Sequence, residues 1–315
     1  YHTAWKKSEG YLENTDFSVW NSHLLLTRTD PRLGRLEFQT GYQQKAFGAN
    51  GFYSLSYPEQ FEATKTLFAT AKWEKMWRYT QLSGNLYERL HHDRFELFRN
   101  PDEAAPWYTG PNYHLTSVTG LDWKLVQRES FGKTTVGMDL RNEEISSNVL
   151  GEPMSVSRPD FFDRYGTFSK SKSRMQTRFF GDQSVYLNSF TLSAGFSANF
   201  HSDFTPVILG GMDVRYDLTQ NLQLLVNLNQ SLRYPTFTDL YYCSATQISN
   251  PYLKPERSTT YEATAQFSKN RFHAYASGFF RRGKNIIDWI RQPDSVRWYS
   301  RNETVLNAYG GELVA

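Results

Sequence analysis

The chain has 315 residues, a formal net charge of +3 and a single cysteine, Cys243. The small charge argues against a nucleic-acid-binding protein, and the lone cysteine excludes an internal disulfide framework and a cysteine-based metal site. Aromatic residues make up 16% of the sequence, although the mean hydropathy is −0.62. This combination suits a membrane β-barrel, whose strands turn one face to a polar lumen and carry aromatic side chains at both membrane interfaces.

Segments in which apolar and polar residues alternate recur along the chain. A period of two predicts strands with one apolar and one polar face, and a tilted strand of about 10 residues crosses the hydrocarbon layer of a membrane. The clearest segment, 190–200, reads FTLSAGFSANF. The alternating segments in chain order are 35–45, 66–73, 120–125, 133–143, 190–200, 206–218, 222–232 and 261–267.

The connections between these segments alternate in length. Short polar turns are expected at 29–34, 74–75, 128–132, 187–189, 219–221 and 268–270. Long loops are expected at 49–63, 99–117, 150–173, 237–258 and 292–299. Short turns at one end and long loops at the other are typical of an outer-membrane barrel. The pattern predicts an all-β antiparallel transmembrane β-barrel with about 14 strands. A large soluble β protein such as a propeller is the alternative, but no blade-like repeat of about 40 residues is present.

Residues 231–264 read SLRYPTFTDLYYCSATQISNPYLKPERSTTYEAT. From the residues alone, Pro235 should end strand pairing because it has no N–H donor, Asn250 and Pro251 should start a turn, and Lys254 should pair with Glu256. The stretch resembles the barrel signature of TonB-dependent outer-membrane receptors, with its Arg-x-Pro-Thr-Phe-x-Asp-Leu-Tyr run followed by Asn-Pro-x-Leu-Lys-Pro-Glu.

Two further stretches carry the resemblance. Residues 6–17, KKSEGYLENTDF, are similar to a Ser-Asp-Gly-Tyr-x-x-Asn-Thr-Asp-Phe hairpin of the same family, with Glu9 in place of the Asp. Residues 41–54, GYQQKAFGANGFYS, and 91–100, HHDRFELFRN, resemble vitamin B12 (cobalamin) receptors of the Bacteroidetes type.

The resemblance implies a 22-stranded barrel in the bacterial outer membrane. Residues 1–315 would then form a partial barrel domain that lacks the plug domain and the terminal strands, so we expect the natural protein to be longer. The implied function is TonB-dependent active import of a scarce bulky nutrient, with cobalamin or a related corrinoid first and a ferric siderophore or haem second. A passive porin or an adhesion barrel is the alternative of another class.

The same resemblance implies the partners. These are outer-membrane lipid, a small-molecule substrate, and TonB acting through the plug, and a surface lipoprotein is a further candidate. We expect no nucleic-acid partner.

Aromatic residues in the long loops are the best candidates for contact with a ligand, because rings supply a large contact area at low entropy cost. No histidine lies between Phe237 and Asn250, where haem receptors of this family usually carry one. The candidate ligand-binding residues are Phe47, Asn50, Phe52, Tyr53, Tyr57, Trp107, Tyr108, Tyr113, His114, Tyr241, Tyr242 and Tyr252.

No catalytic residue and no resident metal site is expected. His91 and His92 are adjacent, so a strand would send them to opposite faces. The sequence has no G-x-S-x-G elbow or paired-carboxylate motif, so we expect no enzyme. Carboxylates on exposed loops could bind Ca²⁺, although they are more often simply solvated. The carboxylates considered for Ca²⁺ are Asp102, Glu103, Asp160 and Asp163.

Overall fold

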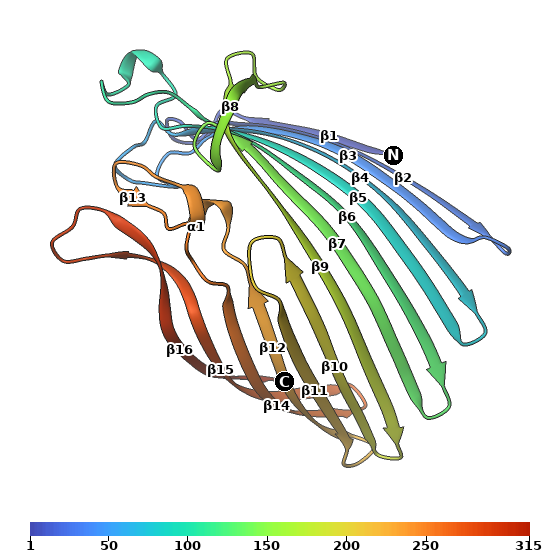
Figure 1. Ribbon diagram of the computed structural model, residues 1–315. Coiled ribbons are helices and arrows are strands. Elements are labelled where there is room, and N and C mark those ends of the chain that lie inside the picture. Colours follow the sequence, from blue (N-terminus) through green and yellow to red (C-terminus); the bar gives the residue numbers. More distant parts are fainter. The chain divides into compact units, whose positions relative to one another are not determined.

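The computed structural model describes the backbone of residues 1–315 and every side chain except that of Thr304. Strands dominate this chain, as the alternating pattern predicts (Figure 1). The strands are β1 (His2–Ser8), β2 (Phe17–Asp30), β3 (Gly34–Gly48), β4 (Phe61–Trp77), β5 (Thr80–Glu96), β6 (Asn112–Glu129), β7 (Gly132–Ser147), β8 (Glu152–Pro159), β9 (Thr167–Leu187), β10 (Phe190–His201), β11 (Val207–Asp217), β12 (Leu222–Arg233), β13 (Gln247–Ile248), β14 (Glu256–Lys269), β15 (Phe272–Arg291) and β16 (Trp298–Val314).

Helical structure is confined to two short elements in the long loops. They are the 3-10 helix η1 (Pro101–Glu103) and the α-helix α1 (Phe237–Tyr241). Within the described part of the chain, neither helix has the length and apolar character needed to cross a membrane.

Contacts divide the chain into two compact units. The first comprises residues 1–74, 84–121 and 141–175, and the second comprises 75–83, 122–140 and 176–315. In each unit the strands neighbour one another in chain order. Of the sixteen strands among the described residues, β8 and β13 are short additions beside β9 and β16, and the remaining fourteen follow one another in sequence order. The predicted number of about 14 strands is therefore confirmed.

The tight turns explain the antiparallel order. Asn188 and Asn270 adopt positive φ values of 49° and 55° between β9 and β10 and between β14 and β15. Asparagine tolerates this left-handed conformation better than other residues with a Cβ. One predicted turn is wrong: residues 74–75 lie inside β4, which continues to Trp77. The charged pair Glu74 and Lys75 continues the strand because it lacks the Gly, Asn, Asp or Pro that a tight turn requires.

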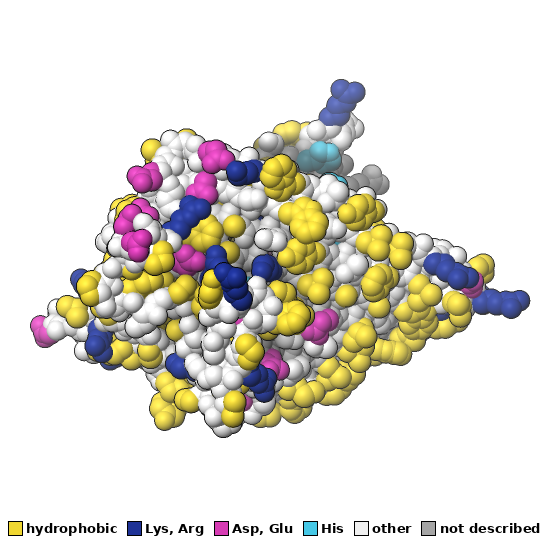
Figure 2. Space-filling view, turned by 90° about the horizontal axis from the view of Figure 1, so that it is seen from above, with side chains coloured by type: hydrophobic (Ala, Val, Ile, Leu, Met, Phe, Trp, Pro, Cys, Tyr) yellow, Lys and Arg dark blue, Asp and Glu magenta, His cyan; other side chains and the backbone are white. Residues whose placement is uncertain are grey.

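The two faces of the strands differ in the way the sequence predicts. On β10, the side chains of Phe190, Phe196 and Phe200 are 42%, 60% and 44% exposed. On the opposite face, the hydroxyl of Ser193 donates to the hydroxyl of Ser184 on β9 at 2.9 Å. Figure 2 likewise shows hydrophobic side chains spread over a broad part of the visible surface. A large exposed apolar surface of this kind marks a membrane-facing protein.

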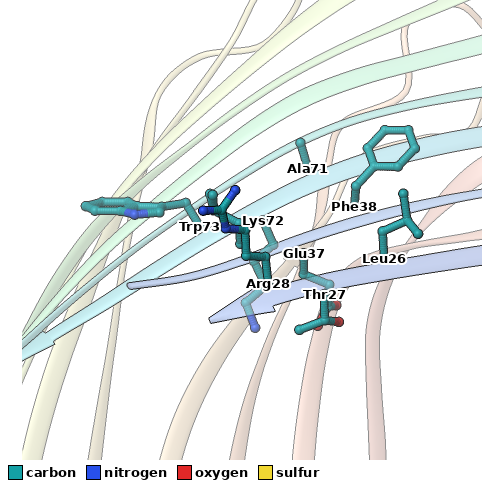
Figure 3. A pocket seen from close by; sticks show the side chains of 9 residues that line it. Leu26, Thr27, Arg28, Glu37, Phe38, Ala71, Lys72 and Trp73 are labelled. Carbon is teal, nitrogen blue, oxygen red and sulfur yellow. The ribbon is translucent and has the colours of Figure 1, made fainter. Parts of the chain in front are cut away.

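The first unit shows the same sorting on β2, β3 and β4. In Figure 3, the side chains of Leu26, Phe38 and Ala71 project to one side of the sheet, and those of Thr27 and Glu37 project to the other. Leu26 pairs with Phe38, and Phe38 pairs with Ala71, so the three residues form one row across the strands. The antiparallel register therefore gathers apolar side chains on a single face.

Candidate functional site

The site is built from long loops at one end of the strands of the first unit. In Figure 1 the connections β3–β4, β5–β6 and β7–β9 gather at the same end of this unit. They comprise residues 49–60, 97–111 and 148–166, the last of which includes β8. Long loops of this kind form the outer surface of a barrel.

Aromatic rings from two of these loops, 49–60 and 97–111, lie together. Phe98 contacts Tyr57, Trp107 and Tyr108 at ring-centroid distances of 5.9, 6.1 and 5.3 Å, and Tyr57 contacts Trp107 at 6.3 Å. These four rings meet edge to face, which is a favourable arrangement for aromatic pairs. The sequence places Tyr57 in one predicted long loop and Trp107 and Tyr108 in another, and the structure brings Tyr57 into contact with Trp107.

A second set of rings lies beside the end of β5. Tyr53 contacts Phe52 at 4.7 Å and Phe95 at 5.4 Å. Its hydroxyl donates a hydrogen bond to Glu62. Burial and this bond raise the pKa of the Tyr53 phenol, so the hydroxyl stays protonated and remains a donor.

We refer to the seven rings of Phe52, Tyr53, Tyr57, Phe95, Phe98, Trp107 and Tyr108 as the aromatic loop cluster. Three of the loop rings remain open to solvent, since Phe52, Tyr53 and Trp107 are 72%, 51% and 56% exposed. Exposed rings that are held by neighbouring rings form a preorganised surface for contact with a ligand. Sequence reasoning missed Phe95 and Phe98, although both come just before the predicted loop 99–117 and that position was the available signal.

An arginine at the base of the cluster ties the loops together. The guanidinium of Arg99 donates to both carboxylate oxygens of Asp16, at 2.5 and 3.0 Å, and to the side-chain oxygen of Asn14 at 3.0 Å. The hydrogen bond from Arg99 holds the pKa of Asp16 below its ordinary value. The Arg99 guanidinium also lies over the ring of Phe61, 4.4 Å from the centroid. The residues of this hairpin motif therefore fix the loop after β5.

Asn14 also holds the loop after β3. Its side-chain amide donates to the carbonyls of Pro58 and Gln60, at 2.7 Å each. Asn50 in turn donates to the carbonyl of Glu13 at 2.8 Å. The loop between β1 and β2 is thus a common anchor for the two loops that carry the aromatic rings.

Polar contacts hold the third loop, residues 148–166, against β4 and β5. The Nε2 atom of His92 lies 2.5 Å from a carboxylate oxygen of Asp160, and both side chains are buried. Arg94 donates to Asp163 at 2.7 Å, and the ammonium of Lys65 donates to the carbonyl of Phe162 at 2.6 Å. This loop is therefore held at three points within the four residues 160–163.

These contacts bear on the metal predictions. His91 bonds to Thr66 and His92 to Asp160, so the adjacent histidines face different partners, as predicted. Asp160 and Asp163 are engaged with His92 and Arg94. Among the described residues, no group of three or more His, Cys, Asp or Glu side chains could hold a metal ion. The structure therefore gives no support to Ca²⁺ binding by Asp102, Glu103, Asp160 and Asp163.

Several predicted ligand residues lie outside the loops. Phe47 belongs to β3, and Tyr113 and His114 belong to β6, which begins at Asn112 rather than after residue 117. Tyr113 is only 7% exposed. The Nδ1 atom of His114 lies 2.8 Å from the hydroxyl of Ser147. The predicted loop position of Tyr113 and His114 is therefore wrong, because the alternating pattern of β6 extends farther than the apolar residues suggested.

In the second unit, the long signature stretch forms a packed corner. The Arg233 guanidinium donates to Glu256 at 2.8 and 2.5 Å, and Glu256 also accepts from the backbone N–H of Ile287 at 2.7 Å. Glu256 thus pairs with Arg233, so the expected pair with Lys254 is wrong. Strand β12 ends at Arg233, just before Pro235, as predicted.

The short helix α1 begins in the same stretch with a capping box between Thr236 and Asp239. Tyr241 packs against the small core of Leu240, Leu253 and Ile287. Tyr252 is 87% exposed on the loop that follows. The stretch thus anchors its loop through buried apolar contacts and leaves Tyr252 at the surface.

Known structures share this arrangement of strands. The copper transporter OprC matches with a TM-score of 0.74 at 15% identity, over 98% of this chain and 52% of that chain. A double mutant of the hemophore receptor HasR from Serratia marcescens, in complex with its hemophore HasA and heme, matches with a TM-score of 0.74 at 13% identity, over 97% and 53%. The siderophore receptor PirA from Pseudomonas aeruginosa matches with a TM-score of 0.69 at 13% identity, over 96% and 56%.

This chain spans about half the length of these solved receptors. At such low identity the likeness shows the fold. The comparison with curated proteins gives no match. The family model described as "TonB dependent receptor-like, beta-barrel" matches residues 4–315, which is nearly the whole chain. The chain therefore belongs to the TonB-dependent receptor β-barrel family, whose barrels lie in the bacterial outer membrane.

Proposed function

We propose that this barrel serves the TonB-dependent import of cobalamin or a related corrinoid across the outer membrane. The observation that carries the proposal is the aromatic loop cluster. Its rings come from two loops and from β5, and they combine exposed apolar area with polar tips. A corrinoid is a wide, rigid macrocycle with a rim of amide groups, so it requires both kinds of contact.

The choice of a corrinoid over other cargo rests on the sequence. The resemblance to Bacteroidetes-type cobalamin receptors falls on residues 41–54 and 91–100. The first stretch covers the end of β3 and the loop that carries Phe52 and Tyr53. The second covers the end of β5 with Phe95 and the start of the next loop with Phe98. The residues that carry the resemblance therefore supply four of the seven rings in the aromatic loop cluster.

The solved relatives show that one fold serves different cargo. They include a copper transporter, a siderophore receptor and a hemophore receptor. Selectivity in such a family belongs to the loops, since the barrel wall is shared. Transport without bond chemistry is the expected task. A ferric siderophore or haem is the alternative cargo, and a passive porin is the alternative mechanism.

The test is a binding titration of the full-length receptor with cyanocobalamin, haem and a ferric siderophore. We expect cyanocobalamin to bind most tightly. The double substitution Phe52→Ala and Trp107→Ala should weaken binding by about 30-fold or more, the usual loss when central aromatic contacts are removed. Phe131→Ala is the matched control, because this exposed ring lies in the short turn between β6 and β7.

Three results would contradict the proposal. The first is failure of the receptor to bind any corrinoid. The second is binding of haem or of the ferric siderophore that is tighter than binding of cyanocobalamin and is lost in the double variant. That result would reassign the cargo. The third is steady ionic conductance of the full-length receptor in a planar bilayer, which would favour the passive porin.

A further inference from the structure

Three basic side chains line a hollow on one face of the second unit. The hollow has a volume of about 250 Å³, and its lining includes Arg257 of β14 and Arg282 and Lys284 of β15. All three side chains are exposed. Among the described residues, no carboxylate forms an ion pair with any of them and none lines the hollow. The hollow therefore presents a concentrated, uncompensated positive charge.

The strand register shows which face carries this charge. Arg257 pairs with Lys284, Thr259 pairs with Arg282, and Tyr261 pairs with Phe280. These pairs are two residues apart along each strand, so their side chains share one face of the sheet. Tyr261 and Phe280 are 51% and 41% exposed, and their rings stack at 6.3 Å. The basic side chains thus continue a row of exposed aromatic side chains.

The opposite face of the same strands has a different character. On that face of β12 and β14, the hydroxyls of Ser231 and Ser258 lie 2.7 Å apart, and Arg233 pairs with Glu256. Ser231 and Ser258 also take part in the lining of the hollow. In a barrel of this family the polar face looks into the lumen, and the face with exposed aromatic side chains looks toward lipid. Arg257, Arg282 and Lys284 are therefore on the lipid-facing side.

The position of the hollow across the membrane follows from the lengths of the connections at the two ends of β14. The turn between β14 and β15 is only two residues long, Asn270 and Arg271, and it lies at the far end of both strands. Arg257 lies next to the long connection that contains α1, and long connections face the outside of the cell. The cations begin about 7 Å beyond the Tyr261–Phe280 pair, since two residues of a strand span about that distance. This position corresponds to the headgroup level of the outer leaflet.

We propose that this hollow binds a phosphate group of a phosphorylated glycolipid of the outer leaflet. Arg257, Arg282 and Lys284 would contact the phosphate, and Gln230 would add a neutral hydrogen-bonding group from β12. Arginine forks match phosphate oxygens well, and lysine supplies a point charge. The acyl chains of the same lipid would lie against Tyr261, Phe280 and Ile208, which is 76% exposed on β11. One molecule thus satisfies both the charged hollow and the apolar surface beside it.

The nearest carboxylate along this face of β16 is that of Glu303, which pairs in register with Ile286, beyond Lys284. It lies outside the lining of the hollow. A divalent cation is therefore a poor occupant, because three positive side chains would repel it.

The test measures glycolipid retained by the full-length receptor after purification in mild detergent. Native mass spectrometry would count bound lipid in the parent protein and in the variant Arg257→Gln, Arg282→Gln, Lys284→Gln. Each cation near a membrane surface contributes roughly a factor of five in affinity, so the triple variant should bind on the order of 100-fold more weakly. The matched control, Lys269→Gln, Arg271→Gln, Arg297→Gln, removes three exposed charges at the end of β14, in the β14–β15 turn and in the loop before β16. It should retain the lipid.

Added lipids identify the group that is recognised. A bisphosphorylated lipid A should bind to delipidated receptor, and its dephosphorylated form should bind far less. Resistance of the folded barrel to SDS at room temperature confirms that each variant is folded. Equal retention by the triple variant and the parent would overturn the proposal. Equal binding of the two forms of lipid A, or displacement of bound lipid by millimolar inorganic phosphate alone, would also overturn it.

Discussion

At the scale of single residues, the loop surface depends on a few polar side chains that the sequence marks only indirectly. Asn14 and Asp16 belong to a recognisable hairpin motif, but their partner Arg99 is more than 80 positions away. His92 and Asp160 are 68 positions apart. A single sequence does not show such distant pairings, because they depend on which loops the strand order brings together.

Removal of the Arg99 side chain should loosen the loops without unfolding the barrel. Arg99→Ala breaks the bonds to Asp16 and Asn14, and partly exposed pairs of this kind contribute about 1 kcal/mol. Hydrogen exchange in residues 49–60 and 97–111 should therefore accelerate about fivefold. Arg128→Ala is the control, because the hydrogen bonds that the Arg128 side chain donates to Gln81 are long, at 3.4 Å. Unchanged exchange in Arg99→Ala would show that the rings alone hold the loops.

The Arg99–Asp16 contact also predicts a response to acid. The pKa of Asp16 is lowered in the folded protein by the hydrogen bond from Arg99, so the carboxylate stabilises the loops fully above its ordinary pKa of 3.8. This contribution is lost as the pH falls through the lowered folded value. Loop protection against protease should stay constant from pH 7 to about 4 and decrease below it. In Asp16→Asn this step should be missing, and an identical acid profile for the variant would assign the step to other groups.

At the scale of elements, period-two alternation predicts strands well and their ends poorly. The segment 190–200 corresponds to β10, but β4 and β6 extend beyond their predicted ends. The reason is physical: these strands continue past the hydrocarbon layer into water, where both faces become polar and the alternation fades. For the same reason, the sequence predicted a loop position for Tyr113 and His114, although both lie in β6.

Gly137 on β7 is packed so closely against neighbouring strands that the addition of one methyl group should destabilise the barrel. A Cβ added at Gly137 on β7 would lie 2.6 Å from the carbonyl oxygen of Trp123 and 2.3 Å from the ring of Phe180. Gly137→Ala should therefore destabilise the barrel by about 1–3 kcal/mol, as overpacking usually does. Gly278→Ala is the matched control within a strand, because its nearest neighbour is 3.9 Å away.

Gel electrophoresis in SDS after heating measures this stability. The quantity recorded is the temperature at which the SDS-resistant folded form disappears from the gel. Gly137→Ala should unfold at a lower temperature than the parent, and Gly278→Ala should match the parent. Equal unfolding temperatures for both variants would show that β6 and β9 move apart without cost.

At the scale of the whole molecule, the sequence predicted the fold class, the strand number and the family because they depend on a repeated local pattern and on motifs within one stretch. The family model matches residues 4–315, in agreement with the resemblance of residues 231–264 and 6–17. The composition of the aromatic loop cluster was only partly predictable. Rings within one loop are visible in the sequence, whereas the contact between Tyr57 and Trp107 depends on how two loops fold against each other.

The central claim is that alternate side chains of each strand face lipid and water. The direct measurement is spin-label accessibility along β10 of the full-length receptor in lipid, with Cys243 replaced by serine and single cysteines at residues 193–198. Labels at Ala194, Phe196 and Ala198 should collide mainly with oxygen, which concentrates in lipid, and labels at Ser193, Gly195 and Ser197 mainly with a water-soluble nickel reagent. Accessibility without this alternation, or with the two sets reversed, would contradict the account.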